Sequence, residues 1–398
     1  MKRIYDKSEP RFIDVAYLNL SKLGEELCGD SIEMVRYEDG VMAVLSDGLG
    51  SGVKANILST LTSKIAITML KSGSAIEEVV NTIINTLPVC RVRNLAYSTF
   101  TIIHMLNSGK VYIANFDNPE VILRRGKEST LIKGEEVIIA NRRVRESEFE
   151  LGDGDTIVAI SDGVAHAGIG AMLNYAWGTE NISNYVAKIP NSISAINTAK
   201  RIISTCNHLY EEKPYDDATV IVMKYVRPKH VTLFTGPPLS IEDDKIIVKK
   251  LTSTYGKKVV CGGTAAQIVA REIGHEIEVD TENINADIPP IAYIKGIDLV
   301  TEGVLTLKKA LDILKEYNND IRHIDEYFKN DKHKNGVYLL LKVLLDEATH
   351  INFIIGRRIN PAHQNFDFPE ELISKLDIIK EIKQELKKLG KVVTAEYY

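Results

Sequence analysis

The chain has 398 residues, of which 44% are hydrophobic and 26% are charged, so its composition is that of an ordinary globular protein with room for two or three domains. A formal net charge of -5 argues against the strongly basic surface of a nucleic-acid binder, and we expect no nucleic-acid partner. No apolar run reaches the roughly 18 residues of a membrane span, and the opening residues MKRIYDKSEPRF lack the apolar core of a signal peptide.

The cysteines indicate a reducing compartment. The chain has four cysteines, which are far apart in the sequence and form no CxxC pair: Cys28, Cys90, Cys206 and Cys261. This spacing argues against a disulfide framework and against a zinc knuckle. We therefore expect reduced cysteines packed as small hydrophobic side chains, in a cytoplasmic protein.

The first half of the chain is predicted to be rich in antiparallel strands. A β-hairpin is expected over 31–46, because two strand-like runs flank the turn residues Glu38, Asp39 and Gly40. Two amphipathic helices follow, one ending at Gly73 and the next halted by Pro88. Further elements are expected as strands over 97–106, 110–116, 120–125, 136–140, 147–151, 155–161 and 218–226, and as a helix over 192–212. Because the links between strands are short, we predict an α+β fold of antiparallel sheets with helices on their outer faces.

The pattern changes near Arg227 and Pro228. Beyond this point short strands alternate with helices, as where KVVCGG leads into TAAQIVAREIG and GIDLVTEG leads into TLKKALDILKEY. Such alternation is typical of an α/β domain. We therefore predict two domains, residues 1–228 and a smaller α/β domain over 229–398.

Two Ser-Asp-Gly tripeptides each close an apolar run, in VLSDGLGSG and in VAISDG. With a two-residue turn at Asp39 and Gly40, residue 32 would face residue 47, and Asp30 would share a sheet face with Asp47 as a diagonal pair about 7–8 Å apart. Asp162 ends the second apolar run, and Asp216 and Asp217 begin the strand at 218. If the strands at 155–161 and 218–226 are antiparallel neighbours, these acids meet at one edge of a sheet.

A cluster of four or five carboxylates is expected to hold cations. Like charges at short range repel, so such clusters persist when they are protonated or bind a metal. Oxygen ligands favour Mg²⁺ or Mn²⁺ over zinc. Gly48 has no side chain, so its backbone could approach a metal closely. Two such ions can share a water and clamp a phosphoryl group, which predicts a phosphate-ester hydrolase.

In this order, the motifs CGDS, SDGLGSG, SDGV and DDATVIV resemble those of the metal-dependent (PPM-type) Ser/Thr protein phosphatase family. The branch they resemble most is that of the bacterial sporulation stage II phosphatases. The resemblance implies an α-β-β-α sandwich, two Mn²⁺ or Mg²⁺ ions with a third left open, and a phosphoserine- or phosphothreonine-bearing partner. An anti-sigma-factor antagonist-like protein is one such partner. The second domain would then regulate, dimerise or recognise substrate.

The resemblance also implies a role for each acid. Asp47 would bridge both ions, and Gly48 would ligate one of them through its carbonyl oxygen. Asp30 would help to bind that same ion, while Asp162 and Asp216 would complete the site of the other. The nucleophile would be a water shared by the two ions.

The remaining catalytic assignments are less complete. Asp217 stands where the family often has Asn, and would orient metal-bound water. Many eukaryotic members have a His after the Asp-Gly pair, but this chain has Leu49. The proton donor would then be another metal-bound water or a group that the sequence does not identify. His166, four residues after Asp162, is a candidate donor, although a loop or packing histidine is the default. The family's phosphate-gripping Arg has no counterpart, since the nearby residues are Lys22, Glu25 and Glu26.

Other readings of the same residues stay open. The protein could be a non-catalytic signalling module with a phosphatase-like fold, or a nucleotide-binding protein in which GLGSG cradles a phosphate. The run Gly262–Thr264 favours a strand-to-helix turn with Thr264 as N-cap over an anion site. Arg91 and Arg93 could meet a phosphoprotein, and the polar loop NPAHQN has no assigned purpose. The charged helix ending at Gly390 is a solvated surface element or the contact of a homodimer.

Overall fold

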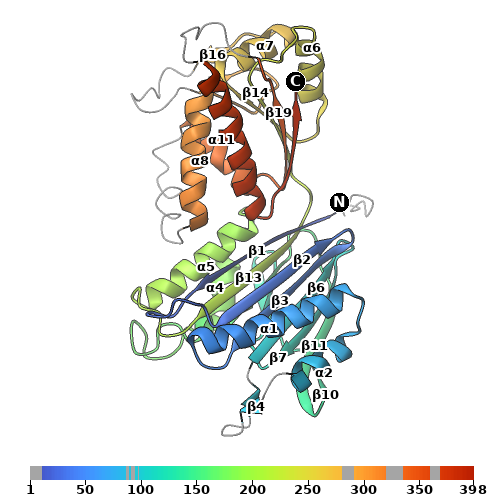
Figure 1. Ribbon diagram of the computed structural model, residues 1–398, viewed down its shortest axis with the longest axis vertical. Coiled ribbons are helices and arrows are strands. Elements are labelled where there is room, and N and C mark those ends of the chain that lie inside the picture. The colour runs from blue at the N-terminus through green and yellow to red at the C-terminus, as the bar shows by residue number, and fades with distance from the viewer. Residues whose placement is uncertain are drawn as a thin grey trace. The chain divides into compact units, whose positions relative to one another are not determined.

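The computed structural model describes residues 11–86, 89–90, 95–96, 98–279, 291–319, 335–358 and 368–398. The chain divides into two compact units, Met1–Arg227 and Pro228–Tyr398 (Figure 1). This division is one residue away from the boundary expected from the change of sequence pattern. Arg91, Arg93 and the loop NPAHQN lie outside the described residues.

The first unit contains two antiparallel sheets. The six-stranded sheet has the order β10 (Glu135–Ile139), β11 (Arg142–Glu150), β7 (Lys110–Phe116), β6 (Ser98–Leu106), β3 (Gly40–Gly48) and β2 (Asp30–Tyr37). The five-stranded sheet has the order β1 (Phe12–Leu20), β13 (Ala218–Val226), β12 (Thr156–Ile160), β8 (Val121–Arg125) and β9 (Glu128–Ile132). A separate small hairpin joins β4 (Val89–Cys90) and β5 (Leu95–Ala96). Strands β1 and β9 were not anticipated from the sequence.

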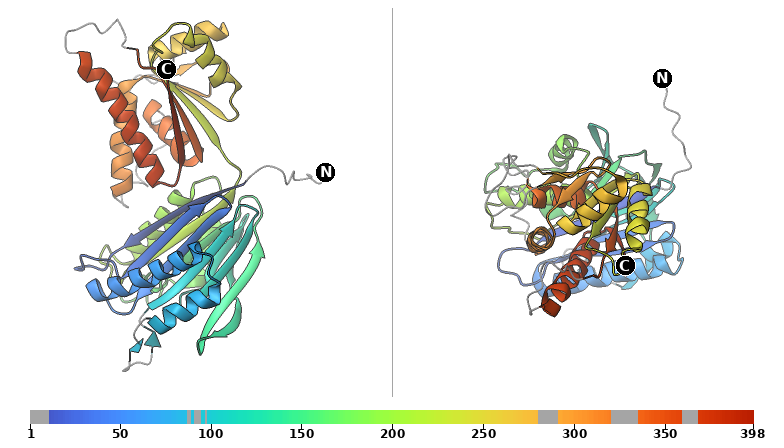
Figure 2. Two further views of the ribbon diagram at one scale, coloured as in Figure 1. Left: turned by 45° about the vertical axis from the view of Figure 1, so that its right-hand side comes forward. Right: turned by 90° about the horizontal axis from the view of Figure 1, so that it is seen from above.

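Alternating side chains of each strand build two apolar layers. In β3, Val41, Ala43 and Leu45 enter the core between the two sheets, whereas Val44 packs in a second cluster with helices α1 (Gly52–Lys71) and α2 (Ile76–Thr86). Helices α4 (Thr179–Lys188) and α5 (Ala195–Leu209) pack on the five-stranded sheet (Figures 1 and 2). The predicted α-β-β-α architecture is confirmed.

The first hairpin has a different register from the one predicted. The closing pair is Tyr37 and Gly40, so Glu38 and Asp39 form the turn, and Asp30 lies directly opposite Asp47. The predicted diagonal pairing was wrong by two residues. Because the side-chain period of a strand is two, this shift leaves both acids on one face and brings them closer, to about 5 Å between Cβ atoms.

The second unit is a three-layer α/β domain, as predicted. Its sheet has the order β16 (Glu278–Val279), β17 (Ala292–Tyr293), β18 (Leu299–Thr301), β15 (Lys257–Cys261), β14 (His230–Thr235), β19 (His350–Ile355) and β20 (Val392–Tyr397). The five strands from β18 to β20 in this order are parallel, and β16 and β17 add an antiparallel edge. Helices α6 (Asp243–Ser253) and α7 (Gly263–Ile273) cover one face, with α8 (Val304–Asn319), α10 (Gly336–Asp346) and α11 (Phe368–Lys388) on the other (Figure 2).

Two local expectations for this unit change. The N-cap of α7 is Gly262, with φ of 115°, rather than Thr264, because the chain leaves β15 in a conformation that glycine adopts without strain. The charged helix α11 is more than a solvated element. Ile379, Ile382 and Leu386 are buried, and Glu385 accepts a hydrogen bond from the Asn318 side chain of α8.

Candidate metal centre

Two of the predicted acids face each other at the open end of the first hairpin. Asp30 begins β2 and is buried, and its partner in the ladder is Asp47 near the end of β3. Asp47 has the same strand parity as Leu45, so it shares the face that looks toward the five-stranded sheet. Neither carboxylate oxygen of Asp30 has a hydrogen-bond partner among the described residues.

Both carboxyl groups of this pair have raised pKa values. Burial raises the pKa of Asp30 to about 8 and that of Asp47 to about 10, because the charged carboxylate is poorly solvated there. Repulsion between the neighbouring acids contributes to both of these shifts. The hydroxyls of Thr219 and Ser161 act in the opposite direction on Asp30. Neither hydroxyl reaches hydrogen-bonding geometry with that carboxylate, and the net pKa shift of Asp30 stays upward.

The second set of acids comes from the facing sheet. Strands β12 and β13 are antiparallel neighbours, with Ile160 opposite Val220, so the end of one and the start of the other lie at the same edge. Asp162 opens the short helix α3 (Asp162–Ala165), and Asp216 precedes β13. The charges of both raise the pKa of Asp47, so these carboxylates approach the first pair closely.

His166 joins this second set. Ligand atoms of Asp162, His166 and Asp216 lie within 4.8 Å of one another, a spacing that could hold a cation. The Nδ1 atom of His166 is 3.9 Å from Asp162 Oδ2, one helical turn away. The sequence offered only the i,i+4 spacing as a signal for this histidine, and its place beside two acids was not anticipated.

Asp217 is buried and held by the loop before β2. Its Oδ1 atom accepts a hydrogen bond of 3.0 Å from the backbone N–H of Lys22. A side chain at Gly29 would approach Asp217 Oδ2 to 2.7 Å, so glycine is required there. The charge of Lys22 also lowers the pKa of Asp216, although burial and Asp162 raise it overall. Lys22, which received no role from the sequence, is thus close to the acids.

The glycine of each Ser-Asp-Gly tripeptide is required by packing. A side chain at Gly48 would overlap the carbonyl oxygen of Ala55 in α1, and one at Gly163 would overlap the carbonyl oxygen of Asp217. The space beside Gly48 is therefore filled by a helix, which differs from the expectation that its missing side chain serves the approach of a metal. A role for the Gly48 carbonyl oxygen stays a prediction.

The serines of the two tripeptides fix the strand ends. Ser46 and Ser98 share a hydrogen bond of 2.6 Å, and the Ser98 hydroxyl donates to the carbonyl oxygen of Asp47. In the facing sheet, the Ser161 hydroxyl accepts from the N–H of Thr219 at 2.8 Å. These bonds hold both Asp-bearing turns against neighbouring strands.

The loop after Asp47 is closed to a phosphate. Glu25 Oε1 accepts a hydrogen bond of 3.1 Å from the Ser51 hydroxyl at the start of α1, and a side chain at Gly52 would meet the Glu25 carboxylate. An acid thus already lies at the helix N-terminus where a phosphate cradle would need space. This arrangement favours a structural turn over nucleotide binding by GLGSG.

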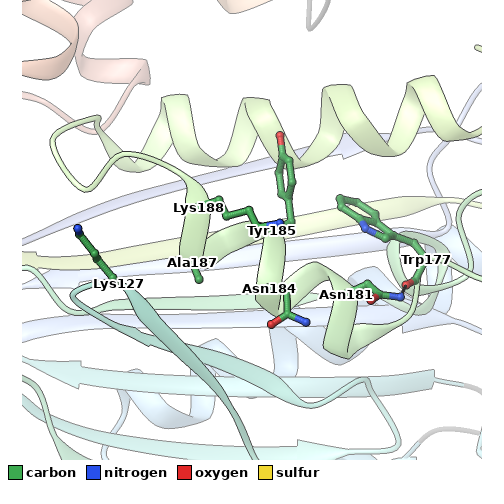
Figure 3. Close-up of a pocket in the computed structure, with 7 residues that line it drawn as sticks. All are labelled: Lys127, Trp177, Asn181, Asn184, Tyr185, Ala187 and Lys188. Carbon is green, nitrogen blue, oxygen red and sulfur yellow. Dashed lines mark hydrogen bonds between the residues drawn. The ribbon is translucent and has the colours of Figure 1, made fainter.

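A separate pocket of about 690 Å³ lies along α4 (Figure 3). Lys127 and Lys188 line it together with two asparagines and the aromatic pair Trp177 and Tyr185, whose ring centroids are 5.5 Å apart. The backbone N–H of Trp177 donates to Ala167, just after α3. The pocket has no acid among its described lining residues, so the acid cluster remains the candidate active site.

Residues 37–226 match the family model described as stage II sporulation protein E (SpoIIE), a family of PP2C-type phosphatases. The predicted family resemblance is confirmed for the first unit. The second unit lies beyond the SpoIIE match. No curated protein matches the chain in sequence.

Among solved structures, the chain is similar to the PP2C domain with a regulatory-domain fragment of SpoIIE from Bacillus subtilis, at 19% identity and a TM-score of 0.49, over 56% of this chain and 66% of that one. It is also similar to RsbU and RsbW domains from Mycobacterium tuberculosis, at 18% identity and a TM-score of 0.47, over 61% and 68%. A third similar structure is the M. tuberculosis phosphatase PstP, at 17% identity and a TM-score of 0.38, over 54% and 99%. Likenesses this distant carry over no activity. Within the described residues, no helix combines the length and apolarity needed to cross a membrane.

Proposed function

We propose that the first unit is a metal-dependent protein phosphatase that hydrolyses phosphoserine or phosphothreonine in a partner protein. The observation that carries this proposal is the buried carboxylate of Asp30, which has no partner among the described residues and faces Asp47. A buried charge without a partner is costly, and a cluster of acids relieves that cost by binding cations.

The donor set fits hard divalent cations. Asp30 and Asp47 from one sheet, and Asp162 and Asp216 from the other, present carboxylate oxygens, which Mg²⁺ and Mn²⁺ prefer. When bound, two such ions would lower the pKa of a water and neutralise the charge of a phosphoryl group. Asp217, fixed by the Lys22 N–H, would orient water within the site.

Lys22 and His166 have supporting roles in this proposal. The charge of Lys22 acts on Asp216, so its ammonium is placed to attract a substrate phosphate. His166 lies beside Asp162 with its side chain about half exposed, so it can exchange a proton with solvent and with a leaving alkoxide. The partner we propose is a small phosphorylated signalling protein of the anti-sigma-factor antagonist kind, which rests on the SpoIIE resemblance.

The test is release of phosphate from a phosphoserine peptide, with Mn²⁺ and with EDTA. We expect Mn²⁺-dependent release that Asp47→Asn abolishes. The matched control is Asp153→Asn, because Asp153 pairs with Arg227 outside the acid cluster and should keep full activity. Equal inactivity of the native protein with and without Mn²⁺, or full activity of Asp47→Asn, would refute the proposal.

Calorimetry separates the proposed enzyme from a non-catalytic signalling module. Binding of Mn²⁺ that is lost in Asp47→Asn supports a metal centre. A concentration of about 1 mM Mn²⁺ is high enough to detect even weakly bound catalytic ions. A module that keeps only the fold would show no Mn²⁺ binding at that concentration.

A further inference from the structure

The sheet of the second unit has a topological switch point. From β14 the chain adds β15 and then β18 on one side, and later adds β19 and β20 on the other. The pairs β14–β15 and β14–β19 are both parallel, so the order reverses between β14 and β19. In open parallel sheets, ligands bind beyond the carboxyl ends of the strands at such a point, where the two connections diverge.

A glycine follows each of four strand ends at this edge. Four strands end within two residues of a glycine, namely β14 at Gly236, β15 at Gly262, β18 at Gly303 and β19 at Gly356. A side chain at Gly303 would lie 3.2 Å from the Cα atom of Gly262, so these two loops pack closely. By contrast, a side chain added at Gly263 would have no neighbour within 4 Å. At Gly356 the carbonyl oxygens of Gly236 and Pro237 fill the corresponding space. The backbone is therefore open to a ligand above β15 and closed between β14 and β19.

A partly buried lysine from α11 reaches this edge. The Lys375 ammonium lies 3.4 Å from the carbonyl oxygen of Gly356, and a side chain at Gly236 would overlap it, so it stands between the ends of β14 and β19. No carboxylate of the described residues forms an ion pair with it. Burial lowers the pKa of Lys375 to about 8, because the ammonium has lost much of its water.

The neighbouring groups favour an anion. The Cys261 thiol is close enough to interact with Lys375, but burial raises its pKa to about 12, so it stays neutral. The first turn of α7 carries no acid and begins at a glycine N-cap. Helix α6 differs, since Asp243 and Asp244 occupy its first turn and would repel a phosphate. Glu302 also acts on Cys261, but its carboxylate accepts a hydrogen bond of 3.3 Å from the Thr306 N–H at the start of α8. The Lys375 ammonium is thus a positive group beside an α7 first turn that carries no acid.

We propose that this edge of the second unit binds the phosphate group of a small phosphorylated molecule, such as a nucleotide, with Lys375 as its counter-charge. The ligand lies above the end of β15, where the free space at Gly263 lets it contact the backbone, and beside the Lys375 ammonium at the ends of β14 and β19. The site is independent of the acid cluster of the first unit, and it gives the second unit a sensing role rather than a purely structural one.

The experiment is calorimetric titration of the full chain with inorganic phosphate, AMP, ATP and adenosine. All titrations use protein that carries Asp47→Asn, in buffer with EDTA. This background removes phosphate binding through cations in the first unit. We expect phosphate or the nucleotides to bind, and Lys375→Gln to weaken that binding at least about tenfold. Lys380→Gln is the matched control, because Lys380 is an exposed lysine of the same helix, and it should bind as the background does.

A second variant protects the test against misfolding. Gly263→Asp adds a carboxylate where a side chain has free space, so it should keep the melting temperature and lose binding. Binding of phosphate alone would identify a free-phosphate site, and tighter binding of AMP or ATP would identify a nucleotide site. The proposal is overturned if none of the three phosphate-bearing probes binds, if adenosine binds as well as AMP, or if Lys375→Gln binds like the background.

Discussion

Asp30→Asn should make the metal-free protein more stable at neutral pH. The carboxylate of Asp30 is buried with no hydrogen-bond partner among the described residues, and its pKa rises from 3.8 to about 8 on folding. A carboxyl whose pKa is raised in the folded state contributes its full stability below pH 3.8 and loses it as the pH rises toward 8. The asparagine carries no charge and loses nothing over that range.

The size of the effect follows from the pH interval. At pH 7 the solution is about three units above the ordinary pKa, and each unit corresponds to about 1.4 kcal/mol, so the ceiling is about 4 kcal/mol. Relaxation around the coupled acids reduces this, and we expect about 1–3 kcal/mol. For a unit of this size, that is a rise in melting temperature of roughly 2–4 °C per kcal/mol. At pH 4 the two proteins should melt together.

The assay is thermal melting in EDTA at pH 4 and pH 7, repeated with Mn²⁺. A ligand at 100 times its dissociation constant stabilises the folded state by about 2.7 kcal/mol, so Mn²⁺ should reverse the order and favour the native protein. Asp14→Ala is the control. Asp14 is also buried but accepts a hydrogen bond of 2.8 Å from the N–H of Ala195, so its replacement should destabilise the protein whether or not Mn²⁺ is present. The reasoning fails if Asp30→Asn melts below the native protein in EDTA at pH 7, or if Mn²⁺ stabilises both equally.

Three further outcomes are expected. Gly163→Ala should destabilise the protein by about 1–3 kcal/mol in urea unfolding and lower activity, because the new methyl group displaces the backbone of Asp217; an unchanged midpoint would contradict this. Tyr210→Phe should cost about 1–2 kcal/mol, since the buried hydroxyl donates to the carbonyl oxygen of Gly163 at 2.6 Å, and calorimetric melting measures this. Lys22→Met should raise KM for a phosphopeptide several-fold with kcat changed less than about twofold; a selective loss of kcat would instead assign Lys22 to the chemistry.

The sequence predicted the acid-bearing strand ends well because each one depends on a local pattern. An apolar run with a Ser-Asp-Gly stop determines where a strand ends, and strand parity determines which face Asp47 shares. The hairpin register needed a further fact, namely that Gly40 pairs with Tyr37 rather than sitting in the turn. The choice between adjacent turn positions depends on the conformation of the loop, which the sequence pattern does not resolve.

The missed elements depend on long-range contacts. Strand β1 pairs with β13 across almost the whole first unit, with Phe12 opposite Val226, and no local signal marks that partnership. Two further tertiary contacts were missed. The Lys22 N–H donates a hydrogen bond to Asp217, and His166 lies close to Asp216. In the second unit, the alternation of strands and helices predicted the fold class, but the place of Lys375 above Gly236 required the packing of α11 on the sheet.

The repeated Ser-Asp-Gly tripeptide combines three constraints that different neighbours impose. The serine forms a hydrogen bond with a neighbouring strand, and the aspartate belongs to the acid cluster. The glycine leaves room for a backbone carbonyl oxygen of another segment. At Gly48 that element is α1, and at Gly163 it is the segment that carries Asp217. A substitution at either glycine therefore moves the site through packing before any metal is involved. Packing alone explains these glycines, whereas the buried carboxyl of Asp30, which has no hydrogen-bond partner among the described residues, has no structural benefit and points to a cation.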